Sequence, residues 1–260
     1  MVTNYSVRVN ELTLTVLGNA TPYPTRDNPC SGYLVTNGDT RVWMDAGTGT
    51  LGPLQHHTGL AELTAIWISH AHADHTADLL TAYYALRYAD IDRDPLPLYC
   101  PPGLADRLAN FLTNGPERSP VESAFAIHEL HDGHQVQLGE LTLTSRAVDH
   151  GIPAFGVRVE SPEASLVFSG DTAACPALTE LASGCDLLLC EAESDQRPAD
   201  EPPVHHTPED AGETAQAAGA RRLLLTHLGR SVSPDDAVTR AAARFAGPVE
   251  FAEPGSHITV

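Results

Sequence analysis

Three histidines and one aspartate lie within six consecutive positions of the sequence. The apolar run before them, residues 63–68, predicts a buried strand, and residues 76–88 predict a helix. The cluster is therefore expected on a turn at the carboxyl end of a strand, where side chains converge on a crevice. Imidazole and carboxylate groups together form the ligand set that Zn²⁺ favours in proteins. The sequence thus predicts a metal site that contains His70, His72, Asp74 and His75.

The acidic composition argues against some classes of partner. The 260 residues carry a formal net charge of −19, and all 15 basic residues are arginines. Such a surface repels a long polyphosphate, so tight binding of a nucleic acid duplex is not expected. A small anion at a metal centre is compatible with this charge, because bound cations dominate the local field.

The sequence gives no signal for a membrane segment or for secretion. No apolar run approaches 18 residues, and the first residues do not combine a charged stretch with an apolar one. A cytoplasmic protein without membrane contact is the expectation. The five cysteines form no C-x-x-C pair, so neither a zinc ribbon nor a disulfide framework is predicted.

The order of the predicted elements indicates the fold class. Strands are followed by helices, and the same succession then repeats, with a hairpin turn at Asn37-Gly38 and a helix start at Thr207-Pro208. Two similar β/α halves packed sheet on sheet would give this order, so an α+β fold is predicted. No change in composition marks a linker, and residues 1–260 are expected to form one domain.

Three further polar residues follow predicted strands and are candidates for the same metal centre. His150 follows the strand over residues 141–148, Asp171 follows a strand that ends near residue 169, and His227 follows the strand over residues 223–226. A carboxylate shared between two cations is an economical way to hold them about 3.5–4 Å apart. These three residues are therefore candidates to complete a centre with the histidine cluster.

The ordered set of these seven residues resembles that of the metallo-β-lactamase superfamily. The resemblance implies a four-layer αβ/βα sandwich with a binuclear centre of two Zn²⁺ ions, or of Mn²⁺ or another divalent metal. Within the superfamily, the segment Asp149-His150-Gly-Ile-Pro153 and the segment His205-His206-Thr207 look like the ribonuclease Z branch. Residues 17–227, nearly the whole chain, take part in the resemblance.

Carried over to this sequence, the resemblance assigns a role to each candidate residue. His70, His72 and His150 would hold one metal, and Asp74, His75 and His227 would hold the other, with Asp171 as the bridge. Asp74 would also accept a proton from the attacking water, and His205 would contact the phosphate and protonate the leaving oxygen. The neighbouring His206 is an alternative substrate contact, and Asp45 would brace the loops that carry the ligands.

One departure from the ribonuclease Z pattern bears on the substrate. The branch carries a long tRNA-gripping arm after the histidine that matches His150, whereas only 20 residues, predicted to form a strand pair, separate His150 from Asp171 here. The chain looks closer to short relatives that hydrolyse cyclic nucleotides, including those that degrade cyclic pyrimidine signals in anti-phage immunity. Residues 18–24 and 28–33 resemble that subgroup.

The leading hypothesis is therefore a binuclear-zinc phosphodiesterase that acts on a small cyclic phosphodiester such as a 3′,5′-cyclic mononucleotide. The alternatives are a tRNA 3′-processing endonuclease, a lactonase or thioesterase on the same fold, and a metal-bound protein without catalysis. Relatives in this branch form homodimers, so a homodimer is expected. Two groups of side chains near the motifs are candidates for substrate contacts. Arginines can bind a phosphate or a base, or else lie on the surface or pair with a carboxylate, and tyrosines can stack on a base or else pack in the core. The candidates are Arg26, Arg87, Arg230, Tyr23, Tyr33 and Tyr84.

Overall fold

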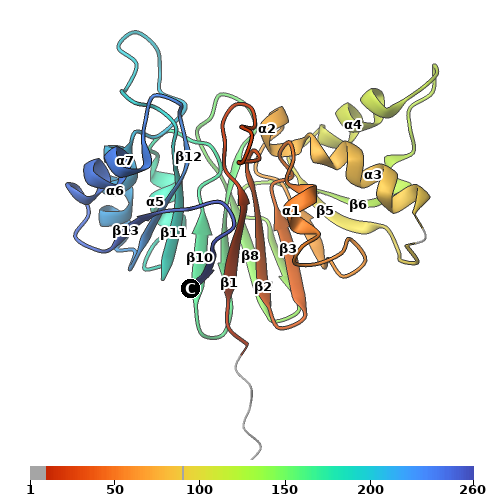
Figure 1. The fold of residues 1–260 in the computed structure, drawn as a ribbon, viewed down its shortest axis with the longest axis horizontal. Coiled ribbons are helices and arrows are strands. Elements are labelled where there is room, and N and C mark those ends of the chain that lie inside the picture. The colour runs from red at the N-terminus through yellow and green to blue at the C-terminus, as the bar shows by residue number, and fades with distance from the viewer. Residues whose placement is uncertain (1–9, 90) are drawn as a thin grey trace, which may run out of the picture.

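The computed structural model describes residues 10–89 and 91–260, and its centre is a pair of seven-stranded sheets. Figure 1 shows the two sheets face to face, with three helices outside each of them. In spatial order, the first sheet contains β14 (His257–Thr259), β1 (Thr13–Gly18), β2 (Gly32–Asn37), β3 (Thr40–Met44), β4 (Ala65–Trp67), β5 (Leu96–Cys100) and β6 (Phe125–Glu129). The second sheet contains β13 (Val249–Phe251), β12 (Leu223–Leu228), β11 (Leu187–Ala192), β10 (Ser165–Phe168), β9 (Phe155–Glu160), β8 (Leu141–Ala147) and β7 (Gln135–Leu138).

Helices cover the outer face of each sheet. Over the first sheet lie α1 (Leu51–Leu54), α3 (Asp78–Tyr88) and α4 (Leu104–Leu112), and over the second lie α5 (Pro176–Leu181), α6 (Pro208–Ala218) and α7 (Pro234–Ala242) (Figure 1). Two shorter elements are α2 (Ala73–Thr76) and the 3₁₀ helix η1 (Val121–Ser123). The predicted four-layer αβ/βα sandwich is therefore confirmed. Within the described residues, no helix is long and apolar enough to span a membrane.

The alternation of side chains along the central strands explains the layers. In β4, Trp67 points between the two sheets, whereas Ile66 points toward the helices, and both side chains are buried. In β3, Met44 and Trp43 divide in the same way. Because both faces of such strands are covered, they consist of continuous apolar runs rather than alternating ones.

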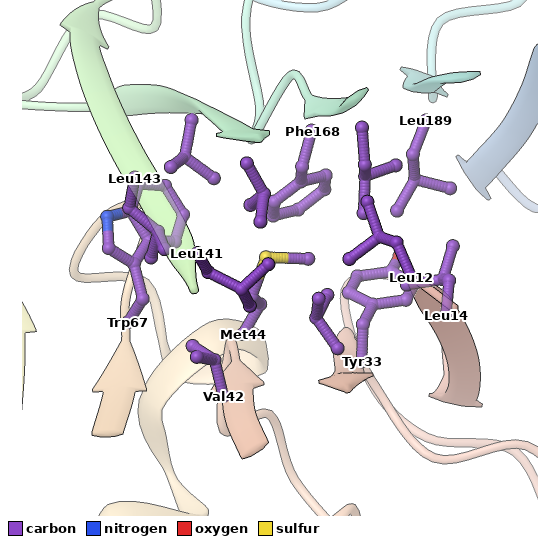
Figure 2. Close-up of a cluster of buried hydrophobic side chains, with 14 of the residues drawn as sticks. Leu12, Leu14, Tyr33, Val42, Met44, Trp67, Leu141, Leu143, Phe168 and Leu189 are labelled. Atoms are coloured by element: carbon purple, nitrogen blue, oxygen red, sulfur yellow. The ribbon is translucent and has the colours of Figure 1, made fainter. Parts of the chain in front are cut away.

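The core between the sheets consists of large apolar side chains from both sheets (Figure 2). The Tyr33 ring packs against Phe168 with ring centroids 5.1 Å apart, and its hydroxyl lies 2.6 Å from Oγ1 of Thr226. Trp67 donates from Nε1 to Oγ of Ser145 over 3.1 Å. Tyr33 is completely buried in this layer, so of its two expected roles, packing in the core or stacking on a base, the structure shows the first.

Sheet topology brings the candidate ligands to one edge. Strands β3 to β6 run parallel in the first sheet, and β10 to β13 run parallel in the second. The loops that follow β3, β4, β10, β11 and β12 therefore approach one another, at the end of the molecule where Figure 1 shows α2. Carboxyl ends of parallel strands are where α/β proteins usually bind ligands.

Most predicted elements are present, with local differences near the histidine cluster. The predicted helix over residues 76–88 is in fact two helices, α2 and α3, with Ala77 between them. Asp74 and His75 therefore lie in a helical turn rather than in the loop, and their side chains project from successive positions of α2. The predicted strand pair between His150 and Asp171 is confirmed as the antiparallel strands β9 and β10.

Candidate metal centre and active site

Seven predicted ligands, which the sequence spreads over 158 positions from His70 to His227, converge in space. One ligand group contains His70, His72 and His150, and a second contains Asp74, His75 and His227. Within each group the potential ligand atoms all lie within 4.8 Å of one another. These two groups are the two triads that the resemblance assigns to separate metals.

Distances within the triads show how closely the imidazoles face one another. Nδ1 of His72 lies 3.0 Å from Nε2 of His70 and 3.2 Å from Nε2 of His150. In the second triad, the Nε2 atoms of His75 and His227 are 3.2 Å apart. Ring nitrogens that point at each other in this way offer lone pairs to a common point, as metal ligands do.

Asp171 lies between the two triads. Its Oδ2 atom is within 4.0 Å of a ring nitrogen of four histidines: His75 at 3.3 Å, His227 at 3.5 Å, His70 at 3.7 Å and His150 at 4.0 Å. Burial would raise the pKa of this carboxyl, but the surrounding imidazoles outweigh burial and hold the pKa well below its usual range. A permanently ionised carboxylate at this point suits a bridge between two cations.

The donor set fits a divalent metal. One polar atom at the centre, Oδ1 of Asp171, is buried without a hydrogen-bond partner among the described residues. Burial and the neighbouring His75 lower the pKa of His70 well below its ordinary value, whereas for His75 the charges of Asp171 and Asp45 outweigh burial and raise the pKa. Imidazole and carboxylate ligands together suit zinc and other first-row metals.

Asp45 holds the loop after β4, which carries the first ligands, through hydrogen bonds. It is completely buried, and its Oδ1 atom accepts a hydrogen bond of 2.7 Å from the backbone N–H of Ser69. Its Oδ2 atom lies 2.7 Å from Nδ1 of His75 and accepts from the Ser69 hydroxyl over 2.8 Å. The same hydroxyl is 3.0 Å from Nδ1 of His70. Asp45 therefore orients one imidazole of each triad, one directly and one through Ser69.

Two site residues have unusual backbone conformations. Among the described residues other than glycine, only Asp45 and His227 have a positive φ, of 55° and 51°. His227 lies inside β12, next to a shift in the register between β11 and β12, and not after the strand as predicted. Such conformations cost about 1–3 kcal/mol each and occur mostly at functional sites. The backbone is thus strained at His227, a predicted ligand, and at Asp45, which orients two others.

His205 lies at the mouth of the centre and is held by a buried acid. Its Nδ1 atom donates to Oε1 of Glu191 over 2.8 Å, which leaves Nε2 free of this contact. Its ring packs against those of His150 and His227, with centroids 4.9 Å and 6.0 Å away. Burial lowers the pKa of His205, but the hydrogen bond and charge of Glu191 outweigh burial and raise it to about 9.

Glu191 is the site residue that the sequence interpretation missed. It is completely buried, and besides His205 it accepts hydrogen bonds from the backbone N–H groups of Thr172 and Glu193. A signal was present in the sequence, because Glu191 directly follows the apolar run over residues 187–190. Asp171 was a candidate ligand for the same reason, because it follows a predicted strand.

His206 does not reach the site. The ring is completely buried, with Nδ1 at 2.6 Å from the carbonyl oxygen of Thr172 and Nε2 at 3.1 Å from Oγ1 of Thr214. Both ring nitrogens are therefore engaged in the packing of α6. The prediction that His206 contacts the substrate is wrong, and the structure separates it clearly from His205.

A central cavity of about 360 Å³ opens above the ligands. Residues from both halves of the chain line it: Thr21, Pro22, His72, Ala73, Asp74, Asp171, Glu193 and His205. The cavity lies at the small end of the usual range for ligand pockets, about 300–1,000 Å³. It therefore suits a small molecule.

The other predicted substrate contacts lie outside this central cavity. Arg26 is almost fully exposed and pairs with Asp27, and Arg87 lies near the exposed Tyr88. Tyr84 stacks on Tyr88 on the outer surface of α3. The guanidinium of Arg230 lies over the Tyr23 ring, 4.2 Å from its centroid.

Comparison with known proteins gives a consistent family. Residues 7–228 match the model of the beta-lactamase superfamily domain. An uncharacterized protein of Mycobacterium tuberculosis is 39% identical over 240 residues, which cover 91% of this chain and 88% of that protein. A ribonuclease Z of Mycobacterium bovis is 30% identical over 273 residues, which cover 92% of this chain and 95% of the relative.

Solved structures show the same fold. The metallo-beta-lactamase fold protein YhfI of Bacillus subtilis superposes with a TM-score of 0.83 at 24% identity, over 96% of this chain and 100% of that structure. A diphosphatase of the PhnP family superposes with a TM-score of 0.75 at 18% identity, over 96% and 98% of the two chains. Two-sheet sandwiches of this kind support many chemistries, so the chemistry must come from the side chains at the site.

Proposed function

The chain belongs to the metallo-β-lactamase superfamily of hydrolases, and on that premise we propose that it is a phosphodiesterase with two zinc ions that opens small cyclic phosphodiesters, in the first place 3′,5′-cyclic mononucleotides. One observation carries the proposal. The Oδ2 atom of Asp171 lies within 4.0 Å of imidazoles from both triads, and His205 lies beside these imidazoles, hydrogen-bonded to the buried carboxylate of Glu191.

When bound, two metals of this kind polarise a phosphoryl oxygen and lower the pKa of a coordinated water to near 7. The chain itself positions the substrate and moves protons. Attack of water at phosphorus forms one P–O bond and breaks the bond to the 3′ oxygen of the ring. Asp74, which lines the central cavity, accepts the proton that the water loses.

His205 supplies the proton for the leaving oxygen. Since Glu191 engages Nδ1, the proton to be donated is on Nε2, and the charge of Glu191 stabilises the protonated ring. The product is a linear nucleoside monophosphate with a free 3′ hydroxyl.

The size and charge of the surroundings favour a small substrate. The segment between His150 and Asp171 is the compact pair of strands β9 and β10. The formal charge of −19 opposes a long RNA. The similarity to a ribonuclease Z nevertheless supports cleavage of a phosphodiester bond.

Turnover of a substrate panel tests the proposal. Zinc-loaded protein is incubated with 3′,5′-cyclic nucleotides of all four bases, with bis(p-nitrophenyl) phosphate, with a lactone and with a precursor tRNA. We expect hydrolysis of cyclic nucleotides and of bis(p-nitrophenyl) phosphate. Turnover of the lactone alone, or of none of the panel, would overturn the proposal. Cleavage of the tRNA alone would identify the endonuclease.

A further inference from the structure

Two more cavities flank the central cavity, one on either side of the ligands. The cavity that we name the loop cavity has about 260 Å³ and lies between the segment after β1 and the segment after β12. The one that we name the helix cavity has about 200 Å³ and lies between α2, α3 and α4. Either one could receive the part of a substrate that extends away from the metals.

The loop cavity and the central cavity share one wall residue. Thr21 lines both the central cavity and the loop cavity. Its hydroxyl lies 3.4 Å from Oδ2 of Asp74, a predicted metal ligand. A group attached to a phosphodiester beside Asp74 can therefore enter the loop cavity past Thr21.

The walls of the loop cavity are fixed and chemically mixed. Leu228, Val232 and Phe251 give it apolar surface, and Asn28 and Thr25 give it polar surface. Asn28 donates from Nδ2 to Oδ1 of Asn19 over 2.8 Å, and the Asn28 Oδ1 atom accepts from the Asn19 backbone N–H. Asn19 in turn donates to the carbonyl of Ala252 over 2.6 Å. Pockets of this kind, preformed and mainly apolar with a few polar groups, suit a flat heterocycle.

Arg230 places an unengaged cation at this cavity. The protein is strongly acidic, and most of its arginine side chains pair with an acid or form a hydrogen bond. In residues 10–89 and 91–260, only the side chains of Arg87, Arg107 and Arg230 have neither an ion pair nor a hydrogen bond. Arg230 lines the loop cavity, and its guanidinium rests on the Tyr23 ring. Stacking on an aromatic ring holds the guanidinium plane and leaves its N–H groups available.

The helix cavity offers much less to a nucleotide. Ala71, Leu80, Leu104 and Leu108 dominate its walls. Arg107 is its only charged residue, and Thr76 is its only other polar side chain. It resembles a packing defect between helices more than a site with converging polar groups.

We propose that the loop cavity binds the nucleobase of the substrate and that Arg230 selects bases with acceptor atoms, guanine above all. This inference rests on the proposed phosphodiesterase function. A guanidinium fork donates two hydrogen bonds to the O6 and N7 atoms of guanine, an arrangement that proteins use repeatedly to recognise this base. Tyr23 positions the guanidinium of Arg230, and the apolar residues of the loop cavity cover the ring of the base.

Direct binding tests the inference without any need for turnover. Zinc-loaded wild type, Arg230→Ala and Arg107→Ala are titrated with guanosine 5′-monophosphate and with ribose 5-phosphate, which lacks the base. The wild type should bind the nucleotide at least about tenfold more tightly than the sugar phosphate. Arg230→Ala should lose that difference and keep its affinity for ribose 5-phosphate. Arg107→Ala, the matched variant on the other cavity, should behave as the wild type.

Three outcomes would overturn the inference: equal affinity of the wild type for both ligands, an unchanged preference in Arg230→Ala, or a loss in Arg107→Ala instead. Kinetics separate this failure from a failure of the proposed function. If the wild type hydrolyses bis(p-nitrophenyl) phosphate but Arg230→Ala retains its base preference, only the base site is wrong. If no phosphodiester is hydrolysed at all, the proposed function is wrong, and the binding data still decide whether a base is bound.

Discussion

The Glu191 carboxylate accepts a hydrogen bond of 2.8 Å from Nδ1 of His205, and the same oxygen accepts one of 2.9 Å from the backbone N–H of Thr172. The loop after β10 and the segment before α6 are thus joined through one buried carboxylate. Because Thr172 follows Asp171, the acid that orients His205 is coupled to the position of the bridging residue. The proposed proton donor and the candidate metal centre are therefore linked through one buried carboxylate.

Replacement of His205 should slow the reaction without removing metal. We expect His205→Ala to lower kcat for a cyclic nucleotide by about 10²–10⁴-fold, the usual contribution of a general acid. Glu191→Gln should act in the same direction with a smaller loss, because the ring keeps a neutral acceptor. Metal content, measured by atomic emission, should stay that of the wild type in both variants.

The leaving group provides the control for this prediction. p-Nitrophenolate departs without a proton, so His205→Ala should lose far less activity on bis(p-nitrophenyl) phosphate than on a cyclic nucleotide. An equal loss on both substrates would mean that His205 binds the phosphate and does not donate the proton.

Asp171→Asn should reduce stabilisation by zinc. For the wild type, zinc at about 100 times its Kd adds about 2.7 kcal/mol to the free energy of unfolding, and removal by a chelator should lower the Tm by about 5–10 °C. In Asp171→Asn, the Tm should rise less with zinc, since the neutral amide is a poor bridge between two cations while both ligand triads remain. Scanning calorimetry with and without a chelator measures the effect. Asp235→Asn, on the exposed start of α7, should respond as the wild type.

Asp45→Asn should weaken metal binding although Asp45 is not among the predicted ligands. An amide nitrogen would face either the Ser69 N–H or the Nδ1 atom of His75, and one of these hydrogen bonds would be lost. Loss of such a partner typically costs about 10–100-fold in metal affinity. Competition with a chromogenic zinc chelator measures the change. An affinity equal to that of the wild type would show that Ser69 alone aligns the ligands.

The ligand positions could be predicted because a simple rule connects sequence and fold. Polar residues after buried strands lie at one edge of a sheet, and the rule found His150 and Asp171 far from the histidine cluster. The same rule applies to Glu191, which follows the apolar run over residues 187–190 and lies within β11 in the structure.

Other features depend on packing that no local pattern records. His205 and His206 are adjacent, and only the docking of α6 decides that His206 turns inward to Thr172 while His205 faces the metal centre. Tyr33 lies in a strand that is covered on both faces, so its position in that strand, not its residue type, puts it in the core. The cavities beside the ligands also arise from loops whose conformation the sequence does not specify.

The cap of α6 gives a prediction for stability as a function of pH. Thr207 and Asp210 form a reciprocal capping box, and Arg197 pairs with the same carboxylate. Burial would raise the pKa of Asp210, but the hydrogen bonds from Arg197 and Thr207 outweigh it and lower the pKa below its ordinary value. The carboxylate therefore contributes stability above about pH 3.9, the unfolded value. That contribution is lost as the pH falls through the lower folded value.

Asp210→Asn should consequently lower the free energy of unfolding at pH 7 by about 1 kcal/mol, the usual worth of a cap. The difference from the wild type should shrink at pH 3, where the carboxyl is increasingly protonated in both states. Urea unfolding at pH 7, 5 and 3 measures it, with Asp236→Asn on α7 as the control, since Asp236 forms no capping box there. A difference that stays constant down to pH 3 would contradict the role of the charged carboxylate.

The same variant should also affect the reaction, because α6 begins three residues after His205 and a weakened cap should loosen the proposed proton donor. Asp210→Asn should therefore lower kcat for cyclic nucleotides more than for bis(p-nitrophenyl) phosphate.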